Sequence, residues 1–234
     1  MTLARYLARL GYGTRREVEA MLRARRVTGP EGQALTDGPV AAHEDIRVDG
    51  APLDPPPGSV ILLHKPVGYV CSTSDRPPLV YDLLPPRFLM RNPVMAPVGR
   101  LDAETSGALL LTDDGPLNHR LTSPRWHAPK TYRVTLAAPP GDDALSLLAQ
   151  GTLLLRGDVA PLAPAIMDRI GTHEVRVTIT EGRYHQVRRM FAAVGSHVSA
   201  LHRETVAGIG VDGLAPGAWR LLEEDEIQRL VRQG

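Results

Sequence analysis

The sequence predicts an α+β fold in two parts, a small domain over residues 1–58 and a larger one over residues 59–234. The first 28 residues carry two amphipathic helical patterns. A proline-rich segment ending in PPPGS at residue 59 is typical of a stiff linker. Beyond it, strands and helices follow one another without regular βαβ alternation, which favours a mixed, largely antiparallel sheet with flanking helices.

The length and composition exclude several classes of protein. A chain of 234 residues can bury a sizeable core. Its apolar runs are far shorter than the roughly 18 residues that span a membrane, and its arginine-rich N-terminus is not typical of a signal peptide. The single cysteine, Cys71, provides neither a disulfide framework nor a thiolate zinc site. We therefore expect a cytoplasmic monomer without a membrane partner.

The N-terminal segment predicts two short helices. Apolar residues at i, i+3, i+4 and i+7 form one stripe that ends at Gly11: Leu3, Tyr6, Leu7 and Leu10. Thr14 and Glu17 then form a capping box that starts a second helix. The outward face of that helix carries Arg15, Arg16, Arg23 and Arg26.

Charge is distributed unevenly along the first part of the chain. Residues 1–28 hold seven arginines against two glutamates, whereas residues 29–59 hold six acidic residues against one arginine. Clustered arginine suits a phosphate backbone. A solvated surface explains the same charge equally well.

The larger domain predicts alternating elements. We expect strands at 59–66, 106–115, 130–138 and 172–182, and helices at 116–124, 187–194 and 223–234. Pro116 fits the first turn of its helix, and Gly195 ends the next one.

A lone carboxylate, Asp102, stands in a polar loop just before the buried run ALLLT. A pair of carboxylates could indicate glycoside hydrolysis, with Glu104 or Asp113 as the second, but the spacing does not decide. His197 and His202 are a weak metal pattern, and no phosphate-binding glycine motif precedes a helix. Nothing nearby in the sequence is an obvious partner for Asp102.

A basic cluster marks the start of the helix at 187–194. It comprises Arg183, His185, Arg188 and Arg189. A helix N-terminus with such side chains favours an anion. Structural ion pairs on the helix edge are the competing interpretation, and on these residues alone the better supported one.

Four segments in order carry a resemblance: HKPVGYVCST, GRLDAETSGALLLTDDG, KTYRVTL and EGRYHQVRRMFAAVGSHVSALHRE. Together they resemble the motifs of RNA pseudouridine synthases, specifically the RsuA-type branch that modifies ribosomal RNA. The N-terminal helices resemble the S4 RNA-binding domain that often precedes the catalytic domain. The acidic insertion GPEGQALTDGP departs from that pattern, so we expect RNA contacts from the helices rather than the hairpin.

The resemblance implies a reaction without cofactor or metal, in which a uridine in RNA is detached from its ribose and rejoined through C5. It makes Asp102 the catalytic aspartate, as nucleophile or base, and Arg188 the positively charged residue that pairs with it and keeps it ionised. Tyr132 becomes the aromatic residue against the uracil. Arg100 would hold the flipped nucleotide. The only lysines, Lys65 and Lys130, fall inside motifs and are candidate phosphate contacts. Arg183, His185 and Arg189 are further candidate RNA contacts.

The expected partner is small-subunit ribosomal RNA or an assembly intermediate, with a target of the uridine-516 type. Two alternatives stay open. One is the same chemistry on large-subunit RNA, and the other is an RNA-binding or ribosome-assembly protein without catalysis.

Overall fold

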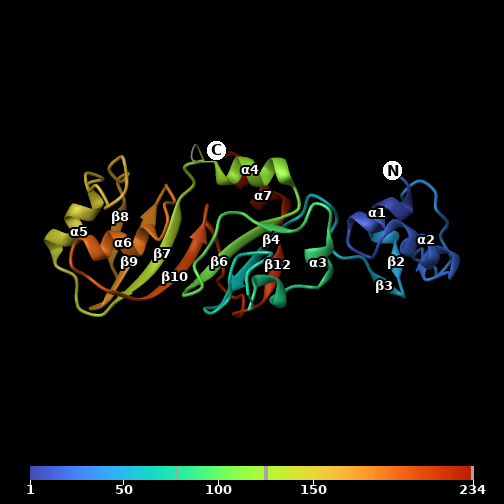
Figure 1. The fold of residues 1–234 in the computed structure, drawn as a ribbon, viewed down its shortest axis with the longest axis horizontal. Coiled ribbons are helices and arrows are strands. Elements are labelled where there is room, and N and C mark those ends of the chain that lie inside the picture. Colours follow the sequence, from blue (N-terminus) through green and yellow to red (C-terminus); the bar gives the residue numbers. More distant parts are fainter. Residues whose placement is uncertain (77, 124–125, 233–234) are drawn as a thin grey trace.

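The computed structural model describes residues 1–76, 78–123 and 126–232. The chain begins with a small N-terminal unit in which two helices cover a short sheet (Figure 1). Its elements are α1 (Leu3–Arg9), α2 (Arg15–Arg23), β1 (Val27–Thr28), β2 (Arg47–Val48) and β3 (Ala51–Pro52), with a 3₁₀ turn at His43–Asp45. Both helices begin where the sequence predicts, and Thr14 and Glu17 form the expected capping box.

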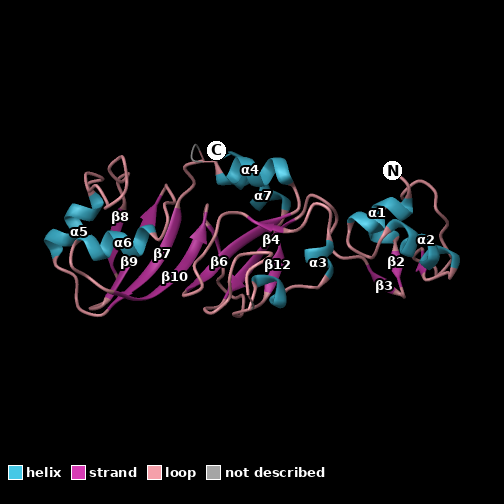
Figure 2. Ribbon diagram, viewed as in Figure 1, coloured by secondary structure: helices cyan, strands magenta, loops and turns pink. Residues whose placement is uncertain are grey.

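The larger part of the chain is built on one long twisted sheet (Figure 2). Its strands are β4 (Val60–Lys65), β5 (Ala96–Pro97), β6 (Thr105–Thr112), β7 (Lys130–Leu136), β8 (Ile166–Arg169), β9 (Glu174–Ile179), β10 (Val198–Val206), β11 (Ile209–Gly210) and β12 (Trp219–Leu221). The main order is β12-β4-β6-β10-β7-β9-β8, and only the β6–β10 pair is parallel among the described strands. The predicted α+β class is therefore confirmed.

Helices pack on both faces of this sheet. They are α3 (Arg87–Met90), α4 (Gly115–Thr122), α5 (Asp142–Ala149), α6 (Gln186–Ala193) and α7 (Glu224–Arg232), with a 3₁₀ turn at Val80–Leu83. Side chains of α3, α5 and α6 join the core on one face, around Leu109 and Val134. Leu121 of α4 and Leu230 of α7 join the core on the other face. None of the described helices has the length and apolar character needed to cross a membrane.

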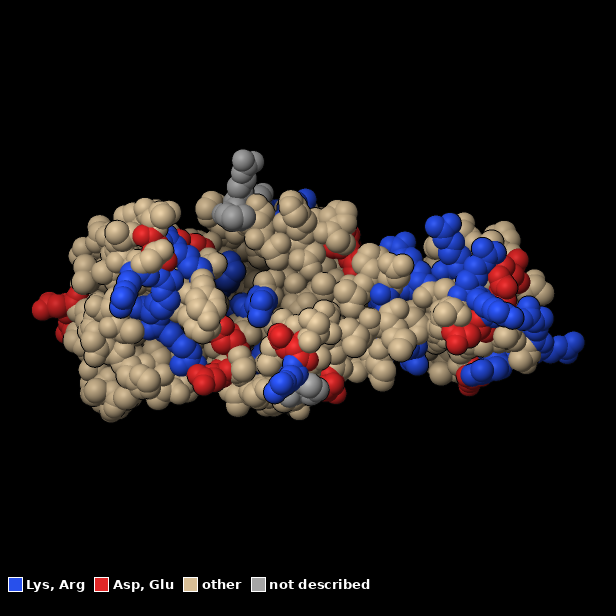
Figure 3. Space-filling model, viewed as in Figure 1, with Lys and Arg blue, Asp and Glu red and all other residues tan. Residues whose placement is uncertain are grey.

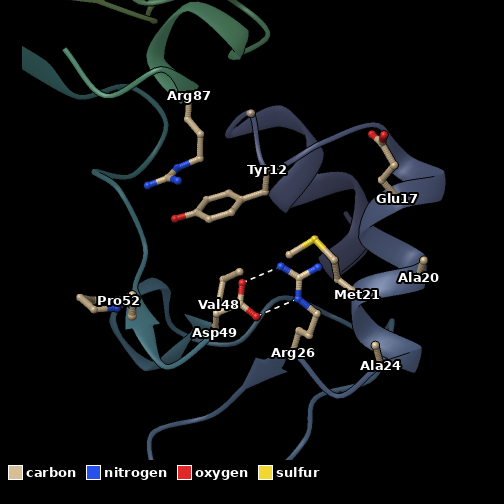
Figure 4. Close-up of a pocket in the computed structure, with 12 residues that line it drawn as sticks. Tyr12, Glu17, Ala20, Met21, Ala24, Arg26, Val48, Asp49, Pro52 and Arg87 are labelled. Carbon is tan, nitrogen blue, oxygen red and sulfur yellow. Dashed lines mark hydrogen bonds and ion pairs between the residues drawn. The ribbon is translucent and has the colours of Figure 1, made fainter. Parts of the chain in front are cut away.

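The N-terminal unit is fastened to the larger part by several contacts. The Arg87 guanidinium pairs with Asp54 and lies 4.8 Å from the centre of the Tyr12 ring (Figure 4). A Cβ on Gly11 would stand 2.5 Å from the Arg87 carbonyl oxygen, so the close approach requires glycine there. Tyr12 and Arg87 line a pocket, and Figure 4 shows that the Arg26–Asp49 ion pair lines the same pocket.

A buried ion pair completes the attachment. The Arg91 and Asp113 side chains are 0% and 3% exposed, with 2.9 Å between Nη1 and Oδ2. Arg91 also donates to the carbonyl of Pro55, and Asp113 accepts from the Gly58 amide. The proline-rich segment is therefore tied to the end of β6.

Candidate active site

A cavity of about 780 Å³, called here the Asp102 pocket, opens beside the centre of the long sheet. Its wall includes Arg100, Asp102, Lys130, Tyr132, His185 and Arg203. In Figure 3, Lys and Arg side chains gather around a hollow left of centre and, separately, over the N-terminal unit on the right. Three of the predicted motifs therefore meet at one cavity.

The loop that carries Asp102 is held from below by Lys65. This side chain stands at the end of β4 and is 0% exposed. Its ammonium donates to the carbonyl oxygens of Pro66, Asp102, Ala103 and Thr105, at 3.0, 3.1, 3.3 and 2.8 Å. Burial lowers the pKa of Lys65. Three of these acceptors belong to the chain around Asp102, so Lys65 fixes the backbone that presents the carboxylate.

The prediction that Lys65 contacts RNA is therefore wrong. A fully buried ammonium cannot reach a phosphate, and its three protons are already taken by four carbonyl acceptors.

The Asp102 carboxylate itself faces the pocket and pairs with His185. The distance between Asp102 Oδ1 and His185 Nε2 is 3.2 Å, and the two side chains are 37% and 39% exposed. His185 precedes α6 with φ at +47°, a left-handed conformation that is unfavourable for a residue with a side chain. Its ring stacks on Tyr184 at 3.8 Å between centroids. A strained backbone thus aims the imidazole at the carboxylate.

The expected Asp102–Arg188 ion pair does not form. Arg188 reaches beneath the loop instead, where its guanidinium donates to the carbonyls of Val198 and Glu104 at 3.2 Å each. Its Nη2 also lies 3.8 Å from the Glu104 carboxylate. The side chain leaves α6 on the edge that faces β10, which directs it under the loop rather than into the pocket.

Asp158 anchors the loop that carries His185. It pairs with Arg183 at 2.8 Å and with Arg189 at 2.6 Å, and hydrogen bonds from Arg189 and then Arg183 lower its pKa. Arg183 also bonds to Glu181 and to two backbone carbonyls. These two arginines, which we predicted to contact RNA, are occupied by bonds within the protein and are only partly exposed. The ion-pair interpretation therefore describes them better.

The inner wall of the pocket is formed by Tyr132 and Arg203. Tyr132 is 8% exposed, and its hydroxyl lies 3.5 Å from Arg203 Nη1. Lys130, on the same strand, donates to the Ala128 carbonyl and lies 5.4 Å from the centre of the Trp126 ring. Burial, with a smaller effect of the charge on Arg203, lowers the pKa of Lys130 to about 8. Lys130 therefore changes charge near pH 8.

Arg100 stands at the exposed rim and makes no hydrogen bond or ion pair with any described residue. The lining residues that sequence reasoning missed include Thr105, Trp126 and Arg203. Arg203 lies within the motif HVSALHRE, but its pattern gave no sign that the side chain is buried. Within the described ranges, no group of three His, Cys, Asp or Glu side chains is arranged to hold a metal ion.

Comparison with known proteins gives consistent matches. The family described as RNA pseudouridylate synthase matches residues 59–193. The Escherichia coli (strain K12) protein named ribosomal small subunit pseudouridine synthase A is 47% identical over 193 residues, 81% of each chain. The Yersinia pestis protein of the same name is 43% identical over 97% of each chain. A crystal structure of a pseudouridylate synthase superimposes with a TM-score of 0.68 at 36% identity and covers 98% of this chain and 99% of its own.

Proposed function

The chain belongs to the RNA pseudouridylate synthase family, and on that premise we propose that it isomerises one uridine of small-subunit ribosomal RNA to pseudouridine. In this reaction the bond between C1′ and N1 breaks and a bond between C1′ and C5 forms, while C5 loses a proton and N1 gains one. Full-length relatives named for the small subunit, at 43% identity over 97% of both chains, support the choice of RNA. A target of the uridine-516 type follows from the resemblance.

Asp102 is the proposed catalytic carboxylate. The observation that carries this assignment is its setting, a partly exposed carboxylate at the pocket whose backbone is clamped by a buried lysine. Such a clamp holds the reacting group in place before the substrate arrives, which is the main structural requirement for rate. The His185 imidazole lies beside the carboxylate, with Nε2 3.2 Å from Asp102 Oδ1.

Tyr132 and Arg100 have separate proposed roles. Tyr132 stands on the inner wall, where its ring can lie against the flipped uracil. Arg100 is exposed at the rim, where it can occupy the space that the base leaves or hold the backbone. Arg188 acts indirectly, since it supports the loop from below.

RNA contacts are proposed for Lys130 and for the N-terminal unit, which we interpret as an S4-like RNA-binding domain over residues 1–58. The arginines proposed for these contacts lie on α2 and just after it, and all are exposed: Arg15, Arg16, Arg23 and Arg26. Arg15 and Arg26 have exposed acidic partners, Glu19 and Asp49. Exposed pairs of this kind are weak, so RNA phosphates can compete for them.

Label release tests the proposal. Unmodified small-subunit RNA carrying tritium at uridine C5 should release label with the wild type and lose that release with Asp102→Asn. Glu104→Gln, two positions away and 84% exposed, is the matched control and should keep wild-type release. Release of label from large-subunit RNA alone would refute the proposed small-subunit substrate. Undiminished release by Asp102→Asn would refute the catalytic role of Asp102.

A further inference from the structure

One row of paired residues across the sheet, called here the Gly107 rung, carries two buried cations next to the pocket. Lys65 of β4, Gly107 of β6, Arg203 of β10 and Tyr132 of β7 are in register. Gly107 has φ at +111°, and a Cβ there would stand 2.1 Å from the Arg203 carbonyl oxygen. The Gly107 rung therefore has no side chain at Gly107, and Lys65 and Arg203 lie on the two neighbouring strands.

Arg203 is incompletely bonded within the protein. The residue is 3% exposed. Its Nε donates to the Ala108 carbonyl at 2.7 Å, and Nη1 lies 3.5 Å from the Tyr132 hydroxyl, at the limit of a hydrogen bond. Its Nη2 is buried and has no partner in the described structure. A guanidinium stays charged in proteins, so it cannot avoid this cost by losing a proton.

A buried donor without an acceptor destabilises the protein, and more strongly when the donor is charged. The unbonded donor of Arg203 belongs to a residue that lines the Asp102 pocket, as do two other buried, unpartnered atoms, Thr105 Oγ1 and Trp126 Nε1. Only five such side-chain atoms occur in the described residues, and three of them belong to residues that line this one pocket. This concentration indicates a ligand that brings its own hydrogen-bonding groups.

We propose that Arg203 is a specificity-determining residue of this enzyme, and that its Nη2 donates a hydrogen bond to a carbonyl oxygen of the flipped uracil. The inference deepens the proposed function and rests on it. A carbonyl oxygen supplies the missing acceptor. Where that oxygen is O4, the contact also selects against cytosine, which carries an amino group at this position, and the donors of that group would repel the guanidinium.

The same contact would strengthen during the reaction. When the bond to C1′ breaks, the uracil ring carries negative charge that is shared with its carbonyl oxygens. A fixed cation in a site closed to water stabilises such charge more than it stabilises the neutral ring. Lys65 on the same rung adds to the positive potential, although its own donors are taken up by the Asp102 loop.

Depth in the pocket favours the base over a phosphate as the acceptor. An enzyme that flips a nucleotide admits the base to the inner part of the site, while the phosphates follow the strand outside. Arg203 is almost completely buried, whereas Arg100 at the rim is exposed. Arg100 is therefore the candidate for the backbone, and Arg203 for the base.

Thio-substituted RNA tests the proposal, because sulfur is a poorer hydrogen-bond acceptor than oxygen. Single-turnover release of the C5 label would be compared for uridine, 2-thiouridine and 4-thiouridine at the target, with the wild type, Arg203→Met and Arg203→Lys. The wild type should react about tenfold more slowly with one of the two analogues, as expected for a lost contact of about 1.4 kcal/mol. That analogue identifies the oxygen that is bound.

Arg203→Met should react at least tenfold more slowly with uridine and should lose the difference between uridine and the analogue. Arg203→Lys, which keeps a buried cation if the methionine variant folds poorly, should show a reduced difference. Arg133→Met is the matched control, since Arg133 lies on the opposite face of the sheet in an exposed pair with Glu204, and it should keep the wild-type ratio. The midpoint of thermal unfolding, measured for each variant, shows whether a slower reaction results only from a less stable fold.

An unchanged ratio in both Arg203 variants, or a wild type that does not distinguish uridine from either analogue, would overturn the proposal. Failure of the proposed substrate is a separate result: a wild type that acts only on large-subunit RNA would refute the small-subunit assignment, and the same ratios would then be measured on that RNA.

Discussion

The Lys65 clamp gives the sharpest test of how the site is held. Lys65→Met keeps the volume of the buried stem but removes the ammonium. Its three protons serve four carbonyl oxygens at 2.8–3.3 Å, and each charge-assisted bond contributes about 1.5–3 kcal/mol. Part of that gain is offset, because burial disfavours the ammonium and lowers its pKa. We therefore expect a net loss of about 2–4 kcal/mol in the free energy of unfolding.

A loss of this size corresponds to a fall of about 5–15 °C in the midpoint of thermal unfolding for a chain of this length. The effect on turnover should be larger, since a displacement of about 1 Å in a catalytic group costs about 100-fold in rate. Unfolding in urea and single-turnover release of the C5 label, measured below the variant's melting temperature, check the two effects.

Lys130→Met is the matched control for stability, because Lys130 donates to one carbonyl only. It should unfold within about 1 kcal/mol of the wild type. If Lys65→Met showed wild-type stability and a rate within threefold of normal, the clamp would have no part in positioning Asp102.

Three further predictions concern pH, the Asp102 partner and the attachment of the N-terminal unit. Because the pKa of Lys130 in the folded protein is about 8, below its ordinary 10.5, the unfolded state holds more protons between these values and stability should rise with pH across that window. If the ammonium contacts RNA, activity should fall above pH 8, and a Lys130→Met variant whose rate still fell there would contradict this. His185→Ala should slow label release about three- to fivefold, because it removes a partly exposed partner of Asp102 whose interaction contributes about 1 kcal/mol or less. An unchanged single-turnover rate would show that the His185–Asp102 pair has no part in catalysis. Asp113→Asn should lose about 3–5 kcal/mol in urea unfolding, because Arg91 stays buried and charged; a loss below 1 kcal/mol would show that the ion pair adds little.

Elements with a strong period were predictable from the sequence. The two N-terminal helices, the strands β4, β6, β7 and β9, and the helix α6 lie where their apolar patterns indicate. The prediction omitted β10, the strand that joins the two halves of the sheet. A register shift between Arg203 and Thr205 interrupts its alternation, and its buried positions include a charged residue. A period-two criterion therefore cannot find it.

The candidate site was predictable in its location but not in its contacts. The motifs brought Asp102, Tyr132 and the segment 183–187 to one pocket. Spacing along the chain does not determine which of several cations reaches a carboxylate. The sequence therefore assigned Arg188 as the partner of Asp102, whereas the structure places His185 beside it. A lysine at the end of a strand is usually exposed, which is why the burial of Lys65 needed the structure.

The buried Arg91–Asp113 pair has a consequence for the geometry of the substrate. It ties the proline-rich segment to β6, the strand that begins just after the Asp102 loop. The segment that joins the arginine-bearing helices to the larger part of the chain is therefore held in place rather than free to change its length. If those helices bind RNA as proposed, the span between the anchored phosphates and the flipped nucleotide is set by the protein. The RNA must then change its conformation to fit that span. A uridine whose intervening nucleotides cannot bend to the span would not be modified, even if the uridine itself is accessible.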